Sequence, residues 1–324
     1  MSKLDALKAM TLIVADTGDF KAIAKLKPVD ATTNPSLLLK VANSTDYDDL
    51  LVESIARARS EKHEFSTARA AEYLAVMVGC EIAKIVPGKV STEIDARLSF
   101  DSQAMITAAQ RLIALYEQQG IQRNRVLIKI ACSWEGIKAA EYLEKQNIQC
   151  NLTLLFNLTQ ARACAEAGVF LISPFVGRIY DYYKAMKPDH AIPVEQDPGV
   201  ISVKKIFDLY RKLDYKTIVM GASFRTSEQV LALAGCDRLT VSPSILETLT
   251  NADGEVLRQL HLPQSVEADN APNLIESDFR LAMCKDPMAN TKLAEGIAQF
   301  CEDQVSLEAL LDSRTREIEM YENQ

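Results

Sequence analysis

The stretch R-V-L-I-K-I-A occupies residues 125–131. Its apolar and largely β-branched residues form a short run of the kind expected for a strand that is buried on both faces, as strands of parallel sheets are. Lys129 stands in the middle of this run. The sequence therefore predicts a buried strand with one charged side chain in its interior.

A lysine in such a strand has three physical outcomes. Burying an ammonium group without a partner costs several kcal/mol, so the lysine either pairs with a carboxylate or loses its proton. A neutral lysine is a nucleophile that can attack a carbonyl group and form a Schiff base. Alternatively, the strand lies at an edge and the ammonium group of Lys129 reaches solvent along its aliphatic stem. The stretch alone leaves these outcomes open.

Composition restricts the class of protein. The chain has 324 residues, of which 48% are hydrophobic and 25% charged, and this is typical of a globular protein with a sizeable core. The net charge of −8 argues against a nucleic acid or an anionic membrane surface as the partner. No apolar run approaches the ~18 residues that span a bilayer, and the start M-S-K-L-D-A-L-K lacks the apolar core of a signal peptide. We therefore expect a cytoplasmic protein.

Cysteine and histidine give no sign of a metal or disulfide framework. The seven cysteines are scattered and include no C-x-x-C pair, so we expect reduced thiols packed as small hydrophobic groups. The three histidines, His63, His190 and His261, are isolated in the sequence. We expect neither a zinc site nor a histidine-based catalytic triad.

Strand and helix patterns alternate along the chain. Strand candidates begin near residues 11, 29, 90, 126, 150, 169, 216 and 238, and nearly all precede a helical pattern. Eight such units over roughly 250 residues predict an α/β protein with a (β/α)8 TIM barrel. A doubly wound open sheet is the alternative, but neither G-x-G-x-x-G nor a P-loop is present. Without repeats or linkers, residues 1–324 are predicted to form a single domain.

Helices are expected over residues 1–10, 47–60, 66–85, 102–119, 134–146 and 159–167, and through Arg178 and Tyr183. Ser36 is expected to cap the helix that follows Asn34-Pro35, and Thr226 the helix that runs to Ala234. The segment from about residue 249 to 324 is expected to be additional helix at the C-terminus.

Polar residues occur at or near the ends of the predicted strands, where the catalytic residues of such barrels lie. Each has a simpler explanation, since a strand-end Asp or Ser is more often a helix cap than a catalyst and an arginine can be a solvated surface charge. The collective pattern is the stronger evidence. These residues are Asp16, Asn34, Glu93, Lys129, Asn151, Thr153, Ser173, Ser223 and Arg225.

This inventory suits Schiff-base chemistry that makes and breaks carbon–carbon bonds. The lysine is the nucleophile, and carboxylates move protons during dehydration and bond cleavage. Amides and hydroxyls can hold the hydroxyl groups of a polyol. Arg225 lies beside a predicted helix N-terminus and can bind a phosphate there, with Arg178 as its partner.

The chain resembles the transaldolases of the long bacterial and eukaryotic type over nearly its whole length. Two specific motifs carry the resemblance, D-A-T-T-N-P-S-L-L from Asp30 and V-L-I-K-I-A-C-S-W-E-G-I from Val126. The stretches N-L-T-L-L-F from Asn151 and I-S-P-F-V-G-R from Ile172 are also similar to the family.

The resemblance implies a class I aldolase-type barrel in which Lys129 forms a Schiff base with a ketose donor. Glu93 and Thr153 would handle a catalytic water, and Asp16 would take the proton of the donor hydroxyl as the carbon–carbon bond breaks. The residues carried over for substrate binding are Asn34, Asn151 and Ser173 for the dihydroxyacetone part, Arg178, Ser223 and Arg225 for the phosphate, and Phe175.

The implied reaction moves a dihydroxyacetone unit between sedoheptulose 7-phosphate and glyceraldehyde 3-phosphate, giving erythrose 4-phosphate and fructose 6-phosphate, in the non-oxidative pentose phosphate pathway. No cofactor or metal is expected, because the protonated imine is itself the electron sink. Phosphorylated sugars are the expected partners, together with a second copy of the chain in a homodimer.

Two rival functions use the same barrel. A fructose 6-phosphate aldolase needs the same lysine, but the length of the chain, the context of Glu93 and Phe175 favour the transferase. A non-catalytic sugar-phosphate sensor would gain little from a buried amine. The chain departs from the family pattern at Cys132 and at N-L-T in residues 157–159. Cys132 is either a site of oxidant sensitivity or an inert packed thiol.

Overall fold

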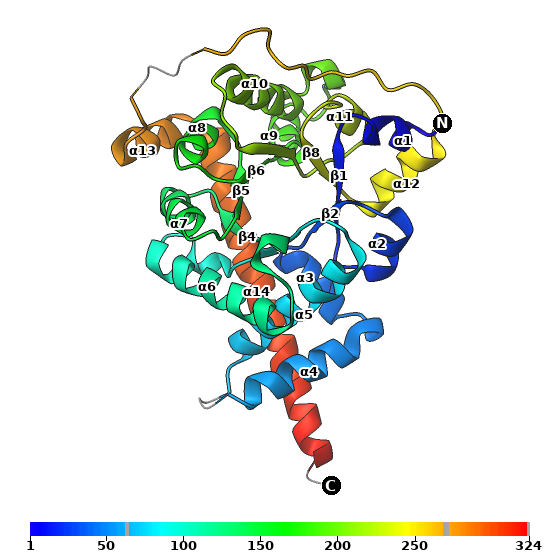
Figure 1. Ribbon diagram of the computed structural model, residues 1–324, viewed down its shortest axis with the longest axis vertical. Coiled ribbons are helices and arrows are strands. Elements are labelled where there is room, and N and C mark those ends of the chain that lie inside the picture. Colours follow the sequence, from blue (N-terminus) through cyan, green and yellow to red (C-terminus); the bar gives the residue numbers. More distant parts are fainter. Residues whose placement is uncertain (62–64, 268–271, 323–324) are drawn as a thin grey trace.

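Figure 1 shows the computed structural model, which describes residues 1–61, 65–267 and 272–322. Eight parallel strands pair in sequence order and close into a barrel, with helices around it. The predicted (β/α)8 architecture is confirmed, and pairing of β1 with β8 excludes an open sheet. The strands are β1 (Leu12–Asp16), β2 (Asp30–Thr32), β3 (Val90–Glu93), β4 (Val126–Ala131), β5 (Cys150–Leu155), β6 (Leu171–Pro174), β7 (Ile218–Gly221) and β8 (Arg238–Val241).

Helices connect the strands and extend the barrel at both ends of the chain. The α-helices are α1 (Lys3–Lys8), α2 (Phe20–Leu26), α3 (Pro35–Ala42), α4 (Asp48–Arg59), α5 (Thr67–Ile85), α6 (Ser102–Gln118), α7 (Trp134–Lys145), α8 (Leu158–Glu166), α9 (Gly177–Met186), α10 (Pro198–Lys212), α11 (Ser227–Leu231), α12 (Pro243–Asn251), α13 (Glu276–Lys285) and α14 (Pro287–Glu322). Short 3₁₀ turns occupy Thr45–Tyr47, Ala96–Leu98, Arg123–Arg125 and Val194–Gln196. Across the described ranges, no helix has both the length and the hydropathy needed to cross a membrane.

The cap of α3 differs from the prediction. Asn34, not Ser36, accepts a hydrogen bond from the backbone N–H of Leu37 (2.9 Å). Proline is favoured at the first helical position, so Pro35 assigns the cap to the residue before it. The hydroxyl of Ser36 instead donates to Asp303 of α14. Thr226 caps α11 as predicted, but α11 ends at Leu231, three residues before the predicted end.

Strand register places three polar residues side by side. Lys129 of β4 lies opposite Glu93 of β3 and opposite Asn151 of β5. Side chains alternate along a strand, so Lys129 shares a face with Leu127, which belongs to a small apolar cluster with Val14, Leu171 and Met220. Such clusters are layers of the barrel interior. Lys129 therefore lies one layer above this apolar cluster, on the side of the carboxyl ends of the strands.

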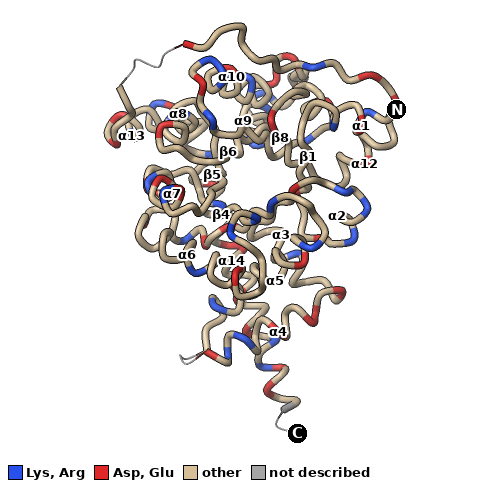
Figure 2. Tube along the Cα trace, viewed as in Figure 1, with Lys and Arg blue, Asp and Glu red and all other residues tan. Residues whose placement is uncertain are grey.

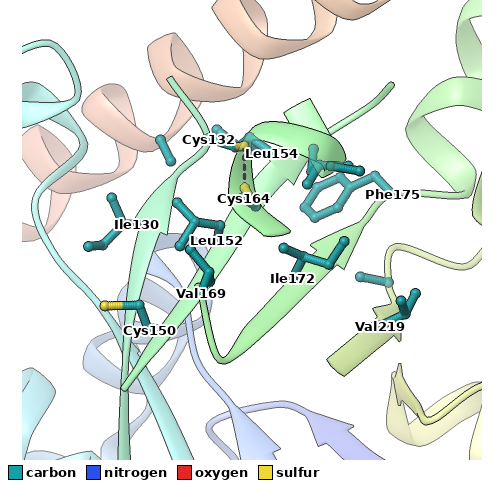
Figure 3. Close-up of a cluster of buried hydrophobic side chains, with 14 of the residues drawn as sticks. Ile130, Cys132, Cys150, Leu152, Leu154, Cys164, Val169, Ile172, Phe175 and Val219 are labelled. Atoms are coloured by element: carbon teal, nitrogen blue, oxygen red, sulfur yellow. Dashed lines mark hydrogen bonds between the residues drawn. The ribbon is translucent and has the colours of Figure 1, made fainter. Parts of the chain in front are cut away.

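The opposite face of β4 and β5 packs against the helices. Figure 3 shows this cluster, in which Ile130 and Leu152 lie near Cys132 and Cys164. The two sulfur atoms are 3.4 Å apart, and both cysteines are free and fully buried. Burial raises the pKa of the Cys164 thiol well above its ordinary value. A buried thiol in apolar surroundings is chemically inert.

The C-terminal segment is only partly helical, so the expectation of helix from residue 249 onward is wrong for part of this region. After α12 ends at Asn251, the described residues 252–267 and 272–275 contain no helix. Gly254 has a positive φ of 139°, and proline interrupts the segment at Pro263 and Pro272. Leu260, which is buried, donates its backbone N–H to Ala234 and so fastens the segment to the barrel.

The long helix α14 crosses one side of the barrel and leaves it at the C-terminus (Figure 1). It contacts β5, α9 and α3. Gly296 allows the close approach, because a Cβ atom there would lie 2.6 Å from Leu154 and 2.9 Å from Arg178. This contact brings residues of α14 next to the carboxyl ends of the strands.

At the start of β5 and β6, the Glu144 carboxylate of α7 joins helix to sheet. It accepts hydrogen bonds from the backbone N–H groups of Cys150 and Phe170, both at 2.8 Å. Burial raises the pKa of Glu144 to about 7, although the two N–H groups oppose this shift. The folded state therefore favours the protonated carboxyl more than the unfolded chain does.

This shift predicts a pH dependence of stability. A raised folded-state pKa gives a contribution that is complete below the unfolded value and is lost as pH rises through about 7. Glu144→Gln should remove that loss, so the variant should gain stability relative to the native chain between pH 5 and 8. The measurement is the free energy of unfolding from urea denaturation at pH 5 and at pH 8. Glu141→Gln on the same helix is the control, because salt bridges lower the pKa of Glu141 and it titrates below this range. If the free energy of unfolding changed equally with pH in Glu144→Gln and in the native chain, the prediction would be refuted.

Candidate active site

A cavity of about 440 Å³ opens at the carboxyl ends of the strands. Its wall is made by residues of the strands, by residues of the loops and helices that follow them, and by Phe300 of α14. Of the residues predicted from the sequence, Glu93 and Asn151 do not line it and lie behind residues that do. The others line it: Asp16, Asn34, Lys129, Thr153, Ser173, Phe175, Arg178, Ser223 and Arg225.

Lys129 is paired with a carboxylate inside the barrel. Its Nζ lies 3.0 Å from Oε2 of Glu93 and also donates to the carbonyl oxygen of Thr33 at 3.3 Å. The side chains of Lys129 and Glu93 are only 6% and 3% exposed, so the alternative in which Lys129 reaches solvent is wrong. Burial raises the pKa of Glu93, and the nearby Lys129 opposes this shift.

Two buried oxygen atoms, one of Glu93 and one of Thr153, are not fully hydrogen-bonded. Thr153 Oγ1 has no hydrogen-bond partner in the described structure, and Oε2 of Glu93 faces Lys129 without a well-aligned hydrogen bond. Buried polar atoms of this kind occur where a water or ligand binds. The following residue, Leu154, has a positive φ of 54°, where the register between β5 and β6 shifts. Such backbone strain gathers at functional sites.

Asp16 stands half-buried on the opposite side of the barrel mouth. Its Oδ1 accepts a hydrogen bond from Thr32 Oγ1 (3.0 Å), and that hydroxyl also contacts Thr240 Oγ1 at 2.9 Å. These bonds hold the carboxylate at the end of β1.

Within residues 1–61, 65–267 and 272–322, no three His, Cys, Asp or Glu side chains gather as ligands for a metal ion, and His63 lies outside these ranges.

The amide groups of the site have different surroundings. Asn151 is fully buried, donates to Ser91 Oγ at 3.1 Å and accepts from Ser173 Oγ at 2.6 Å. Ser173 lines the cavity, so Asn151 acts on the site through this hydroxyl. Asn34 uses its oxygen to cap α3, and its side chain lines the cavity next to Leu37.

The other end of the cavity is cationic. The guanidinium of Arg178 lies between the rings of Phe175 (5.2 Å) and Phe300 (5.4 Å). Burial lowers the pKa of Arg178 from its ordinary value. Arg225 is exposed, and its Nη1 lies 3.4 Å from Ser223 Oγ. Ser223 has a positive φ of 61°.

Sequence reasoning missed several residues of the wall, including Thr17, Lys40, Phe224, Thr240 and Phe300. Lys40 follows Asn34 and Leu37 at helical spacing, so periodicity could have identified it. Thr240 lies between the apolar residues Leu239 and Val241 on β8, and strand alternation could have identified it. No local pattern points to Phe300, because only the packing of α14 brings it to the barrel.

Comparison with known proteins agrees with this geometry. The family described as transaldolase/fructose-6-phosphate aldolase matches residues 13–311. Transaldolase A of Escherichia coli K12 is 53% identical over 316 residues, which cover 97% of this chain and 100% of the relative. The transaldolase of Methylobacillus flagellatus is 56% identical over 309 residues, covering 95% of this chain and 97% of the relative. The chain belongs to the transaldolase/fructose-6-phosphate aldolase family.

Proposed function

We propose that this chain is a transaldolase that transfers a dihydroxyacetone unit from sedoheptulose 7-phosphate to glyceraldehyde 3-phosphate. The products are erythrose 4-phosphate and fructose 6-phosphate, and the pathway is the non-oxidative pentose phosphate pathway. The buried contact of Glu93 with Lys129, which lines a cavity whose far end is cationic, carries the proposal. The similarity to curated transaldolases over almost the full chain supports it.

In the first half of the reaction, the unprotonated amine of Lys129 attacks the C2 carbonyl of the donor and forms a carbinolamine. Loss of water then gives a protonated imine. Glu93 is placed to accept a proton from the amine and return it to the departing hydroxyl, since its Oε2 lies 3.0 Å from Nζ. Its raised pKa favours the protonated acid that this second step needs. Thr153 Oγ1 is a further contact for the water.

In the second half, Asp16 removes the proton of the C4 hydroxyl and the C3–C4 bond breaks. The bonding electrons move into the imine to form an enamine, and the aldehyde fragment leaves. The enamine then attacks the aldehyde carbon of the acceptor, and the same steps run in reverse. Asn34 and Ser173, with Asn151 behind it, would hold the hydroxyl groups of the bound unit, beside Phe175.

Arg178, Arg225 and Ser223 would bind the phosphate. A guanidinium matches the geometry of phosphate oxygens, and Arg178 is held in place by two aromatic rings. Lys40 is a further cationic residue of the cavity wall. Acidic and basic residues are spread over the helices around the barrel (Figure 2), and these cations offset the net negative charge of the chain where an anionic substrate must enter.

We further propose that residues 1–324 form a single domain and that two copies form a homodimer in the cytoplasm. The packing of α14 across β5, α3 and α9 supports the single domain. Resemblance to the family supports the dimer. Seven scattered cysteines, all free, suit a reducing compartment.

Trapping the intermediate tests the function directly. Incubation with fructose 6-phosphate and sodium borohydride should leave a reduced dihydroxyacetone adduct on Lys129, found by intact-mass spectrometry and peptide mapping. Lys129→Ala should form no adduct and should have no turnover. Turnover of fructose 6-phosphate should require an acceptor aldehyde in the native chain, because without one the dihydroxyacetone unit stays on Lys129. Turnover by folded Lys129→Ala would refute the mechanism, and cleavage that is equally fast without acceptor would make the chain an aldolase.

Replacing Glu93 should slow the chemistry without removing the nucleophile. Glu93→Gln should lower kcat about 10²-fold or more, the scale of general acid–base catalysis. It also leaves a buried ammonium without its counter-charge, so circular dichroism must confirm the fold. An unchanged kcat in the folded variant would exclude Glu93 from the mechanism.

Replacing Arg225 should affect the phosphate selectively. Arg225→Ala should raise KM for fructose 6-phosphate far more than for fructose, with glyceraldehyde as the acceptor in both assays. Arg123→Ala is a matched control, because Arg123 precedes β4 at the amino end of the barrel. Equal changes in KM for the two donors would show that Arg225 is not a phosphate ligand.

A further inference from the structure

The segments that carry Arg178 and Arg225 are joined by backbone hydrogen bonds. The N–H of Val176 donates to the carbonyl of Ala222 (2.8 Å), and the N–H of Gly177 donates to the carbonyl of Ser223 (2.5 Å). A Cβ atom at Gly177 would lie 2.3 Å from that Ser223 oxygen, so only glycine permits this approach. The loop before α9 and the loop after β7 therefore form one unit.

Asp181, one turn into α9, joins the same two loops through side chains. Its carboxylate contacts Nη2 of Arg225 at 2.6 Å and Nε at 3.1 Å. These two nitrogens form one edge of the guanidinium. The Nη1 group, on the other edge, faces Ser223 Oγ at 3.4 Å. The backbone N–H of Arg225 is held separately by Gln229 at 2.7 Å.

We infer that Asp181 is a positioning residue that orients Arg225 for phosphate binding, an inference that rests on the proposed function of Arg225. Asp181 occupies the Nε and Nη2 edge and directs the Nη1 edge, with the Ser223 hydroxyl, toward the phosphate. The pair is about two-fifths exposed, at 41% and 43%, and exposed ion pairs contribute little to stability. Its value lies in reducing the number of conformations that a long, exposed arginine side chain can adopt.

The sign of the effect separates positioning from simple electrostatics. A carboxylate near a phosphate repels it, so electrostatics alone predicts that removing the charge of Asp181 improves binding of a phosphorylated donor. Positioning predicts the opposite, because a mobile Arg225 binds phosphate less tightly. The two accounts therefore differ in the direction of the change in KM.

The test compares Asp181→Asn with the native chain, using fructose 6-phosphate and fructose as donors and glyceraldehyde as the acceptor. We expect KM for fructose 6-phosphate to rise roughly tenfold, the scale of one charge-assisted hydrogen bond, while kcat and the KM for fructose stay within about twofold. Asp214→Asn is the matched control, because Asp214 is an exposed ion-paired residue before β7 at the amino end of the barrel. An unchanged or lower KM for fructose 6-phosphate would overturn the inference, as would an equal rise for both donors.

A double-mutant cycle gives a second readout. If Asp181 acts only through Arg225, Asp181→Asn should have no further effect on KM in an Arg225→Ala background. Additive effects would overturn the inference. If Arg225→Ala raises KM selectively for fructose 6-phosphate but Asp181→Asn leaves that KM unchanged, only the positioning role of Asp181 is refuted. If Arg225→Ala itself changes KM equally for both donors, the proposed phosphate role fails and the inference fails with it.

Discussion

Burial of the Lys129 ammonium beside the Glu93 carboxylate is the constraint on which the proposed active site depends. Breaking such a pair by removing one partner costs about 3–5 kcal/mol, a large part of the ~5–15 kcal/mol by which a domain is stable. The pair therefore needs an exact register between β3 and β4, and that register holds these residues opposite each other. The same arrangement supplies an amine and a proton acceptor 3.0 Å apart, which Schiff-base chemistry requires.

The surrounding fold supports this arrangement from two sides. Below Lys129, the apolar layer that contains Leu127 closes the barrel interior. Beside the mouth, α14 supplies Phe300 to the wall and comes so close to β5 that a Cβ atom at position 296 would lie 2.6 Å from the Leu154 side chain. Two residues of this region have positive φ: Leu154, inside β5 where its register with β6 shifts, and Ser223, two residues after the end of β7. Strain of this kind persists only where the rest of the structure holds it in place.

Local patterns predicted most of the fold. Alternating strand and helix signals located all eight strands to within a few residues, because buried parallel strands are short apolar runs and their helices are periodic. The errors came where two signals compete. Asn34 and Ser36 are both good caps, and the proline between them decided for Asn34. Beyond residue 251, the expectation of continuous helix is wrong in part, because glycine, proline and the hydrogen bond of Leu260 to Ala234 favour a non-helical path.

The sequence by itself determined the barrel and the residues at the ends of its strands, because strand order and side-chain alternation follow from local pattern. Only the tertiary structure decided which of those residues meet and how. It placed Asn151 behind Ser173, set Glu93 against Lys129, and brought in Phe300, which is distant in sequence from every strand. It also paired Asp181 of α9 with Arg225 of the loop after β7. Such contacts depend on how loops and helices pack around the barrel, and packing joins segments that no local pattern connects.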